Sequence, residues 1–307
     1  MQRSRIFFAA LLAVLFGAAA GKPAAAAVQV FACEPEWAAL AEVIGGARVD
    51  AFSATTGTQD PHHITARPSL IAQMRTADLV VCTGAGLESG WLPLLLRQAS
   101  NPRVLPRSRG YMEVASLVTL REVPALLDRR EGDVHAHGNP HIQTDPRHFL
   151  PIARALADRL SEIDAAGVAE YQKSLADFTA RWNTAIARWQ ASALPLQGVP
   201  VMVQHKNLFY LLDWLGMREV GALEPVPGVA PTTGYLADVL RTSAAAQPRM
   251  VLLASYESDR PARWFSERAR IPVVVLPLTV GGVRGADTLE AVFDEMIGRL
   301  LAGSGQR

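Results

Sequence analysis

Short apolar runs alternate with longer amphipathic stretches along most of the chain. Short apolar runs are typical of buried strands, and we expect strands at residues 28–33, 49–54, 78–82, 199–203, 249–254 and 273–276. Apolar residues three or four positions apart predict helices at residues 36–44, 69–76, 87–99, 146–163, 168–193, 207–215, 232–245, 261–269 and 287–301. Strands that alternate with helices favour parallel, doubly wound sheets of the α/β class.

The long helix expected at residues 168–193 indicates how the chain is divided. Beyond roughly 250–300 residues a single hydrophobic core stops growing, so a chain of this length is expected to form two lobes. We predict an N-terminal α/β lobe at residues 28–145, a helical linker region at 146–194 and a C-terminal α/β lobe at 195–307. The long helix would join the lobes rigidly, and we interpret its apolar stripe as core packing: Tyr171, Leu175, Phe178, Trp182, Ile186 and Trp189.

The first residues have the pattern of a secretory signal peptide. Arg3 and Arg5 give a positive start, residues 6–20 are almost wholly apolar, and residues 25–27 offer a small-residue cleavage site. A transmembrane anchor is the alternative, but the apolar run is too short to span a bilayer comfortably. We expect residues 1–27 to be removed. Because no cysteine directly follows the apolar run, we expect a periplasmic protein without a lipid anchor.

Removal of residues 1–27 changes the charge balance only slightly. It takes away three basic side chains, which leaves 27 basic and 29 acidic ones and a formal net charge of −2. Binding to nucleic acid through its phosphates needs a concentrated basic face. This composition therefore argues against nucleic acid as a partner.

The two cysteines, Cys33 and Cys82, each stand at the end of an expected strand. In a parallel sheet these strands could be neighbours, which would place both thiols at the same edge, and an oxidising compartment would then favour a disulfide. Such a bond closes a loop of about 50 residues and is worth roughly 4 kcal/mol in the chain-entropy model. Two buried free thiols are the alternative. Metal ligation is a third possibility, although neither cysteine has another Cys or a His nearby at ligand spacing.

Three histidines that lie far apart in the sequence are candidate metal ligands. His62 follows an expected strand, His141 ends a polar loop, and His205 follows another expected strand. Parallel sheets bind their ligands at the carboxyl ends of the strands, and imidazole is a common protein ligand for zinc and related metals. The sequence therefore predicts a metal site that only the folded chain can assemble.

Four groups of residues, in order along the chain, form motifs around these histidines. They are Asp60-Pro61-His62 followed by Arg67-Pro68-Ser69, Ala77-Asp78-Leu79-Val80 with Leu87-Glu88, Asn139-Pro140-His141 followed by Asp145-Pro146, and Gln204-His205 with Leu215-Gly216. Together they resemble the motifs of the solute-binding proteins of zinc and manganese ABC importers, and the resemblance runs from about Val28 to the C-terminus. It implies two lobes joined by a rigid helix, a metal ion in the cleft between them, and delivery of that ion to a membrane permease.

The resemblance implies His62, His141 and His205 as the imidazole ligands when it is carried over residue by residue. His62 is preferred to its neighbour His63 because it directly follows Asp-Pro. In many members of the family a carboxylate completes the site. We expect a fourth donor here as well.

This chain departs from the family in its carboxylates. Many members have an aspartate in the last strand where this chain has Leu276, and manganese members commonly have a glutamate where this chain has Ala230. Glu257 and Asp60 are the candidates to replace these groups, and water is the remaining option. Asp60 could instead orient a ligand by accepting its second ring proton.

Three imidazoles without those carboxylates favour zinc. Zinc accepts three nitrogens and one further donor in a tetrahedron, whereas manganese favours oxygen-rich sites of higher coordination. The resemblance points the same way, since zinc members often carry a histidine-rich segment just before the second ligand. We interpret His135 and His137 as such an accessory metal loop, and solvated side chains are the alternative.

A zinc-dependent hydrolase is the main rival from another class of protein. The sequence contains no His-Glu-x-x-His helix motif and no Gly-x-Ser-x-Gly turn motif, so we expect a binding protein and not an enzyme. We expect it to act as a monomer that captures Zn²⁺ for an ABC permease. A Mn²⁺-binding transport protein is the alternative, and an adhesin is less favoured.

Overall fold

The structure is a computed structural model that describes residues 26–124, 133 and 135–305. Within this part of the chain the strands form two four-stranded parallel sheets, with the orders β2-β1-β3-β4 and β6-β5-β7-β8. The strands are β1 (Val28–Ala32), β2 (Val49–Ser53), β3 (Leu79–Cys82), β4 (Tyr111–Glu113), β5 (Pro200–Val203), β6 (Arg218–Ala222), β7 (Val251–Ala254) and β8 (Val273–Leu276). In each sheet the chain moves from an inner strand to one edge and then crosses to the other side. This arrangement confirms the predicted two-lobed, doubly wound α/β fold.

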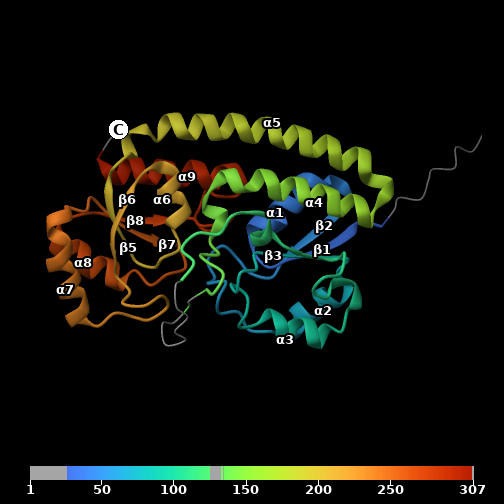
Figure 1. Ribbon diagram of the computed structural model, residues 1–307, viewed down its shortest axis with the longest axis horizontal. Helices are drawn as coiled ribbons and strands as arrows, with labels where there is room; N and C mark the ends of the chain where they lie inside the picture. Colours follow the sequence, from blue (N-terminus) through green and yellow to red (C-terminus); the bar gives the residue numbers. More distant parts are fainter. Residues whose placement is uncertain (1–25, 125–132, 134, 306–307) are drawn as a thin grey trace, which may run out of the picture.

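Helices cover both faces of each sheet, and one long helix lies along both lobes (Figure 1). This helix is α5 (Val168–Ser192). The other helices are α1 (Pro35–Gly45), α2 (Pro68–Thr76), α3 (Leu92–Ala99), α4 (Phe149–Ile163), α6 (Phe209–Leu215), α7 (Thr233–Ser243), α8 (Arg260–Ala269) and α9 (Leu289–Ser304). Among the described residues, no helix has both the length and the apolar character needed to cross a membrane.

The apolar stripe of α5 is core, as predicted. Five of its six side chains are buried and Leu175 is half-buried against them. The ring of Trp182 lies 5.1 Å from that of Phe149 on α4 and 5.7 Å from that of Phe293 on α9, measured between centroids. Trp189 donates a hydrogen bond of 2.6 Å from Nε1 to Asp294 on α9. Helix α5 therefore packs against elements of both lobes, which ties them together.

Two strands and one helix boundary differ from the sequence-based expectation. Strands β4 and β6 were not predicted, because both are edge strands, β4 has only three residues, and Arg218 and Glu219 of β6 are exposed and polar. The helix expected at residues 87–99 begins only at Leu92. The preceding residues form turns, in which the Glu88 carboxylate accepts a hydrogen bond of 3.0 Å from the backbone N–H of Gly84.

A disulfide joins Cys33 to Cys82, which confirms the predicted pairing. Strands β1 and β3 are neighbours in register, with Ala32 opposite Val81. Both cysteines are fully buried. The bond lies at the carboxyl ends of the two strands and fixes the edge of the first sheet that faces the second lobe.

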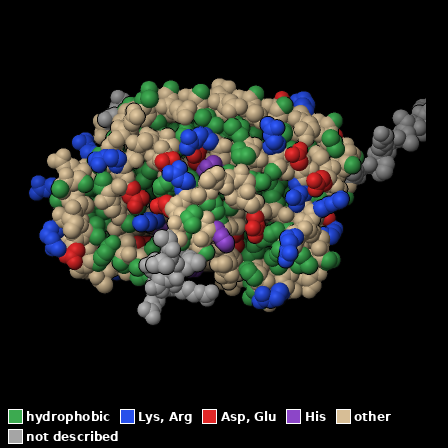
Figure 2. Space-filling model, in the orientation of Figure 1, with side chains coloured by type: hydrophobic (Ala, Val, Ile, Leu, Met, Phe, Trp, Pro, Cys, Tyr) green, Lys and Arg blue, Asp and Glu red, His purple; other side chains and the backbone are tan. Residues whose placement is uncertain are grey.

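The two lobes meet through loops that pack closely. Ser255 donates a side-chain hydrogen bond of 3.2 Å to the carbonyl of Gly57, and Thr279 donates one to the carboxylate of Glu36. A Cβ atom at Gly57 would lie 2.4 Å from the backbone of Gly281 and Gly282, so only glycine fits at this contact. On the face shown in Figure 2, acidic and basic side chains are interspersed, and little histidine surface is visible.

Candidate metal centre

Four imidazole rings from distant parts of the chain meet between the lobes. His62 lies in the loop after β2, and His205 directly follows β5. His135 and His141 lie in the segment that leads to α4, and a short 3₁₀ turn begins directly after His141. The ring centroids of His62 and His141 are 5.2 Å apart, those of His62 and His205 are 5.9 Å apart, and those of His141 and His205 are 6.0 Å apart. The structure thus brings the three predicted candidates together.

Each lobe supplies one histidine whose second ring nitrogen is bonded to a carboxylate. In the N-terminal lobe, Nδ1 of His62 lies 2.7 Å from Oδ1 of Asp60. Burial raises the pKa of Asp60, but the hydrogen bond and charge of His62 outweigh this effect and the pKa is lowered overall. The ionised carboxylate accepts the Nδ1 proton, so the lone pair of His62 Nε2 is directed to the cluster.

The C-terminal lobe repeats this arrangement with Glu224, which sequence reasoning did not identify. Nδ1 of His205 lies 2.7 Å from Oε2 of Glu224. Burial lowers the pKa of His205, but the hydrogen bond and charge of Glu224 more than compensate and raise it. Glu224 follows β6, the strand that the sequence did not predict, and this explains why its position at the sheet edge was missed.

His141 has two ring nitrogens that have no hydrogen-bond partner in the part of the chain that the structure describes. Its side chain is only 2% exposed. Burial lowers the pKa of His141 well below its usual value, and the charges of His62, His205 and His135 lower it further. A buried, neutral imidazole without a partner is costly unless another group binds it. A metal ion held by the cluster would satisfy one of these nitrogens.

His135 joins the same cluster, whereas the sequence placed it with His137 in a separate accessory loop. Its Nε2 lies 3.2 Å from Nε2 of His62, and ligand atoms of His62, His135 and His141 all lie within 4.8 Å of one another. Burial lowers the pKa of His135 to about 4. The nearby backbone is fixed to the C-terminal lobe, because the N–H of Asp133 donates to the carbonyl of Pro227 at 3.0 Å. His137 is exposed and lies outside the cluster.

The rings of His62, His141 and His205, and the ring of His135 beside His62 and His141, have spacings close to those around a single tetrahedral ion. The described centroid distances among them range from 5.2 to 6.2 Å. Rings that bind one ion through Zn–N bonds of about 2.1 Å have centroids roughly 5 Å apart. Small inward movements of the rings would therefore complete such a site.

The family model for the periplasmic component A of the zinc-uptake complex, ZnuA, matches residues 30–302. The chain belongs to this family. The family consists of solute-binding transport proteins and is not an enzyme family.

Two relatives are similar in sequence. The metal ABC transporter substrate-binding lipoprotein SloC of Streptococcus mutans is 20% identical over 264 residues, which cover 84% of this chain and 83% of SloC. The manganese ABC transporter substrate-binding lipoprotein PsaA of Streptococcus mitis is 26% identical over 172 residues, which cover 54% of this chain and 52% of PsaA.

Solved structures of the same kind share the fold. A zinc-bound deletion mutant of ZnuA has a TM-score of 0.74 at 22% identity, with 92% of this chain and 100% of that chain covered. A cadmium-bound periplasmic metal-binding protein of Candidatus Liberibacter asiaticus has a TM-score of 0.71 at 13% identity, with 89% and 98% covered. At these identities the likeness establishes the two-lobed fold of this ZnuA-family chain and no more.

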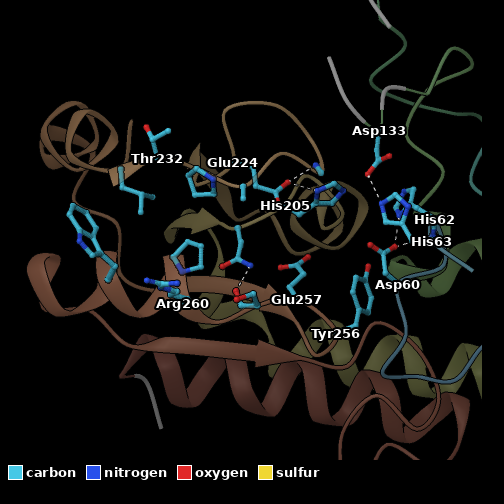
Figure 3. Close-up of a pocket in the computed structure, with 18 of the residues that line it drawn as sticks. Asp60, His62, His63, Asp133, His205, Glu224, Thr232, Tyr256, Glu257 and Arg260 are labelled. Atoms are coloured by element: carbon cyan, nitrogen blue, oxygen red, sulfur yellow. Dashed lines mark hydrogen bonds and ion pairs between the residues drawn. The ribbon is translucent and has the colours of Figure 1, made fainter. Parts of the chain in front are cut away.

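Glu257, one of the candidates for the fourth donor, is engaged elsewhere in this ZnuA-family chain. Its Oε1 accepts a hydrogen bond of 2.6 Å from Nδ2 of Asn207, and its Oε2 accepts one of 3.1 Å from the N–H of Ala254. Burial raises the pKa of Glu257 to about 7. Figure 3 shows it beside His205 in a pocket of about 720 Å³ that also reaches His62. Of the described residues, His135 is better placed than Glu257 to be the fourth donor.

The other two histidines have different surroundings. The side chain of His63 is 65% exposed and faces Asp133, with 3.6 Å between Nε2 and Oδ2. Nδ1 of His148 lies 2.8 Å from the carbonyl oxygen of Ile142. Neither ring is therefore part of the cluster.

Replacing Glu224 by glutamine tests whether it orients His205. We expect Glu224→Gln to weaken zinc binding about 10- to 100-fold, as is usual when the partner of a ligating histidine is lost. Competition with a chromophoric chelator at pH 7.5 measures the affinity. Glu219→Gln, on the exposed side of the same strand, is the control and should leave the affinity unchanged. Equal affinities for the two variants would remove the orienting role.

Proposed function

We propose that this chain captures Zn²⁺ in the cleft between its lobes and delivers it to the membrane permease of an ABC importer. The observation that carries the proposal is the convergence of four imidazole rings, among which His141 is buried with both nitrogens unpartnered in the described part of the chain. We propose His62, His135, His141 and His205 as the ligands. Family membership supports the transport role.

The donor set favours zinc over manganese. The carboxylates near the cluster are already hydrogen-bonded to other groups: Asp60 to His62, Glu224 to His205, and Glu257 to Asn207. The donors left are imidazole nitrogens, which suit tetrahedral zinc, whereas manganese prefers oxygen. Four protein ligands also leave no open position for a reactive water, which argues against a zinc hydrolase.

Capture and release of the ion depend on how the ligands are oriented and on how the two lobes are joined. Asp60 and Glu224 hold the Nδ1 protons of their histidines, so each Nε2 is free to bind metal without rotating. Because α5 packs against both lobes, we expect small shifts of the lobes and not a wide opening. A permease that contacts both lobes could separate His62 from His205 and so lower the affinity for the ion.

We also propose that the protein works in the periplasm, as a monomer and without a lipid anchor. The relatives SloC and PsaA are lipoproteins. In this chain both cysteines are paired with each other, so neither is free to carry a lipid. The proposed signal peptide, residues 1–27, lies almost wholly outside the described residues.

Elemental analysis combined with metal competition tests the proposed cargo. We expect the oxidised mature protein to bind one Zn²⁺ per chain and to keep it in the presence of excess Mn²⁺. Glu257→Ala should bind zinc with little change, because Glu257 is not a ligand in this proposal, whereas His135→Ala should bind it less tightly. Preferential retention of manganese, or a large loss in Glu257→Ala alone, would contradict the proposal. A deletion strain should grow poorly under zinc chelation, a defect that an adhesin would not cause.

A further inference from the structure

A second group of metal-ligating side chains lies at the carboxyl ends of β1 and β3, apart from the imidazole centre. The Sγ atoms of Cys33 and Cys82 and a carboxylate oxygen of Glu88 all lie within 4.8 Å of one another. All three side chains are buried, with Glu88 only 2% exposed. In the oxidised protein the two sulfurs are bonded to each other, so they are not available as ligands.

Glu34 adds an unsatisfied acceptor to this group. It directly follows Cys33 and is 3% exposed, and its carboxyl group is within hydrogen-bonding reach of that of Glu88. Oε2 of Glu34 accepts hydrogen bonds from the N–H and the hydroxyl of Thr83, at 3.3 and 3.0 Å. Its Oε1 is buried without a partner among the described residues. Burial and the neighbouring charges of Glu88 and Glu36 raise the pKa of Glu34 well above its usual value, so this carboxyl holds a proton that a bound cation would replace.

The backbone would keep the two sulfurs together after reduction. Strands β1 and β3 are adjacent, and the N–H of Cys33 donates to the carbonyl of Val81 at 2.9 Å. The Cα atoms of the two cysteines are 4.8 Å apart. These positions are set by the sheet as well as by the disulfide, so reduction would leave two thiols side by side next to Glu34 and Glu88.

We propose that the reduced protein binds a second divalent ion of the zinc or cadmium type through Cys33, Cys82, Glu88 and Glu34, and that disulfide formation abolishes this site. Two thiolates and two carboxylate oxygens make a four-donor set that suits zinc.

The redox step balances with a dithiol as reductant. The dithiol gives two electrons and two protons to the Cys33–Cys82 bond, becomes a cyclic disulfide, and leaves two thiols. Metal binding then releases the two thiol protons as the sulfurs become thiolates, together with any proton held by the Glu34 and Glu88 carboxyls. A disulfide compound as oxidant takes two electrons from the two thiolates and two protons from water and becomes two thiols, while the Cys33–Cys82 bond forms again and the ion leaves. The site is thus available to a newly exported chain before its cysteines pair, and bound metal would delay the pairing.

Titration with Co²⁺ tests the site independently of the imidazole centre, because only thiolate ligands give thiolate-to-cobalt charge-transfer absorption in the near ultraviolet. The protein is reduced with dithiothreitol and desalted without oxygen. We expect two Co²⁺ per chain with the thiolate band when reduced, and one without the band when oxidised. His141→Ala should lose the first ion and keep the thiolate band, so failure of the proposed function and failure of this site are distinguishable.

Variants distinguish the loss of a metal ligand from the loss of the fold. Reduced Glu88→Gln should bind the second ion at least about tenfold more weakly, whereas Glu42→Gln, an exposed glutamate on α1, should match the wild type. The Cys33→Ser/Cys82→Ser protein should bind one ion and show no thiolate band. Circular dichroism follows the fold on reduction. One ion per reduced chain, absence of the thiolate band, or loss of the fold on reduction would each overturn the proposal.

Zinc protection of the thiols gives a second readout. Alkylation of reduced wild-type protein by iodoacetamide should slow at least about tenfold when zinc is present, because the thiolates are ligated. The same zinc should protect His141→Ala equally well. Equal alkylation rates with and without zinc would contradict the site.

Discussion

Replacing His141 by alanine should lower the affinity for zinc more than replacing any other residue of the imidazole cluster. We expect a loss of about a thousandfold, or ~4 kcal/mol, which exceeds the 10- to 100-fold typical for a residue that only supports a ligand. The reason is the surroundings of the ring. His141 is the most buried of the four imidazoles, its pKa is lowered by burial, and both its nitrogens are unpartnered in the described structure.

The affinity of His141→Ala is measured by competition with a chromophoric chelator, and its fold is measured by thermal unfolding of the metal-free protein. His148→Ala is the matched control, since His148 lies seven positions along the same segment but bonds to the carbonyl of Ile142 and not to the cluster. Saturating zinc should raise the Tm of the wild type and of His148→Ala by mass action, and should have little effect on His141→Ala. An affinity within threefold of the wild type would show that His141 is not a ligand.

The fold was largely predictable because its strands are short apolar runs at regular intervals between amphipathic helices. The inner strands β1, β3, β5 and β7 and the edge strand β8 are buried or half-buried and read directly as apolar runs. The edge strands β4 and β6 carry polar, exposed residues, and their pairing is decided by neighbours that only the folded sheet provides. The disulfide between Cys33 and Cys82 was predicted from the expected neighbouring strands together with an oxidising compartment, with two buried free thiols as the alternative.

The site was less predictable, because the folded structure decides which carboxylates contact the histidines. Asp60 lies two residues from His62, so local sequence was enough to suggest that it orients the ring. Glu224 lies 19 residues from His205 and depends on the edge strand β6, and nothing in the local pattern links the two. His135 was expected in the solvent or in a separate loop. Its place in the cluster follows from contacts of its loop with the C-terminal lobe.

Both lobes thus pair a histidine with a carboxylate, but the two residues are 2 positions apart in the N-terminal lobe and 19 apart in the C-terminal lobe. A histidine at the carboxyl end of a sheet faces its counterpart, and a carboxylate behind each one holds the Nδ1 proton, as Figure 3 shows for His205 with Glu224 and for Asp60 near His62. The carboxylates that might have attracted manganese instead increase the basicity of imidazole ligands. This arrangement explains how the chain can lack the family carboxylates at Leu276 and Ala230 and still offer a complete set of donors.

Lowering the pH from 7.5 to 5 should progressively weaken zinc binding, because protons compete with the metal for the imidazole nitrogens, by up to about tenfold per pH unit for each ring that takes up a proton. His205 is one ring that takes up such a proton. Its pKa is lowered by burial but raised overall by the hydrogen bond and charge of Glu224, so it takes up a proton at a higher pH than an ordinary histidine. His135, with a pKa of about 4, and His141, with a pKa well below the usual value, stay neutral and do not compete.

Glu224→Gln separates this effect from a general loss of binding. Without the carboxylate charge the pKa of His205 should fall, so the variant binds zinc more weakly at pH 7.5 but loses less affinity as the pH decreases. The two affinity curves should therefore approach each other towards pH 5. Chelator competition at half-unit steps, corrected for protonation of the chelator, gives both curves. A wild-type affinity that is constant from pH 7.5 to 5, or parallel curves for the two proteins, would show that the proton on His205 does not control zinc binding.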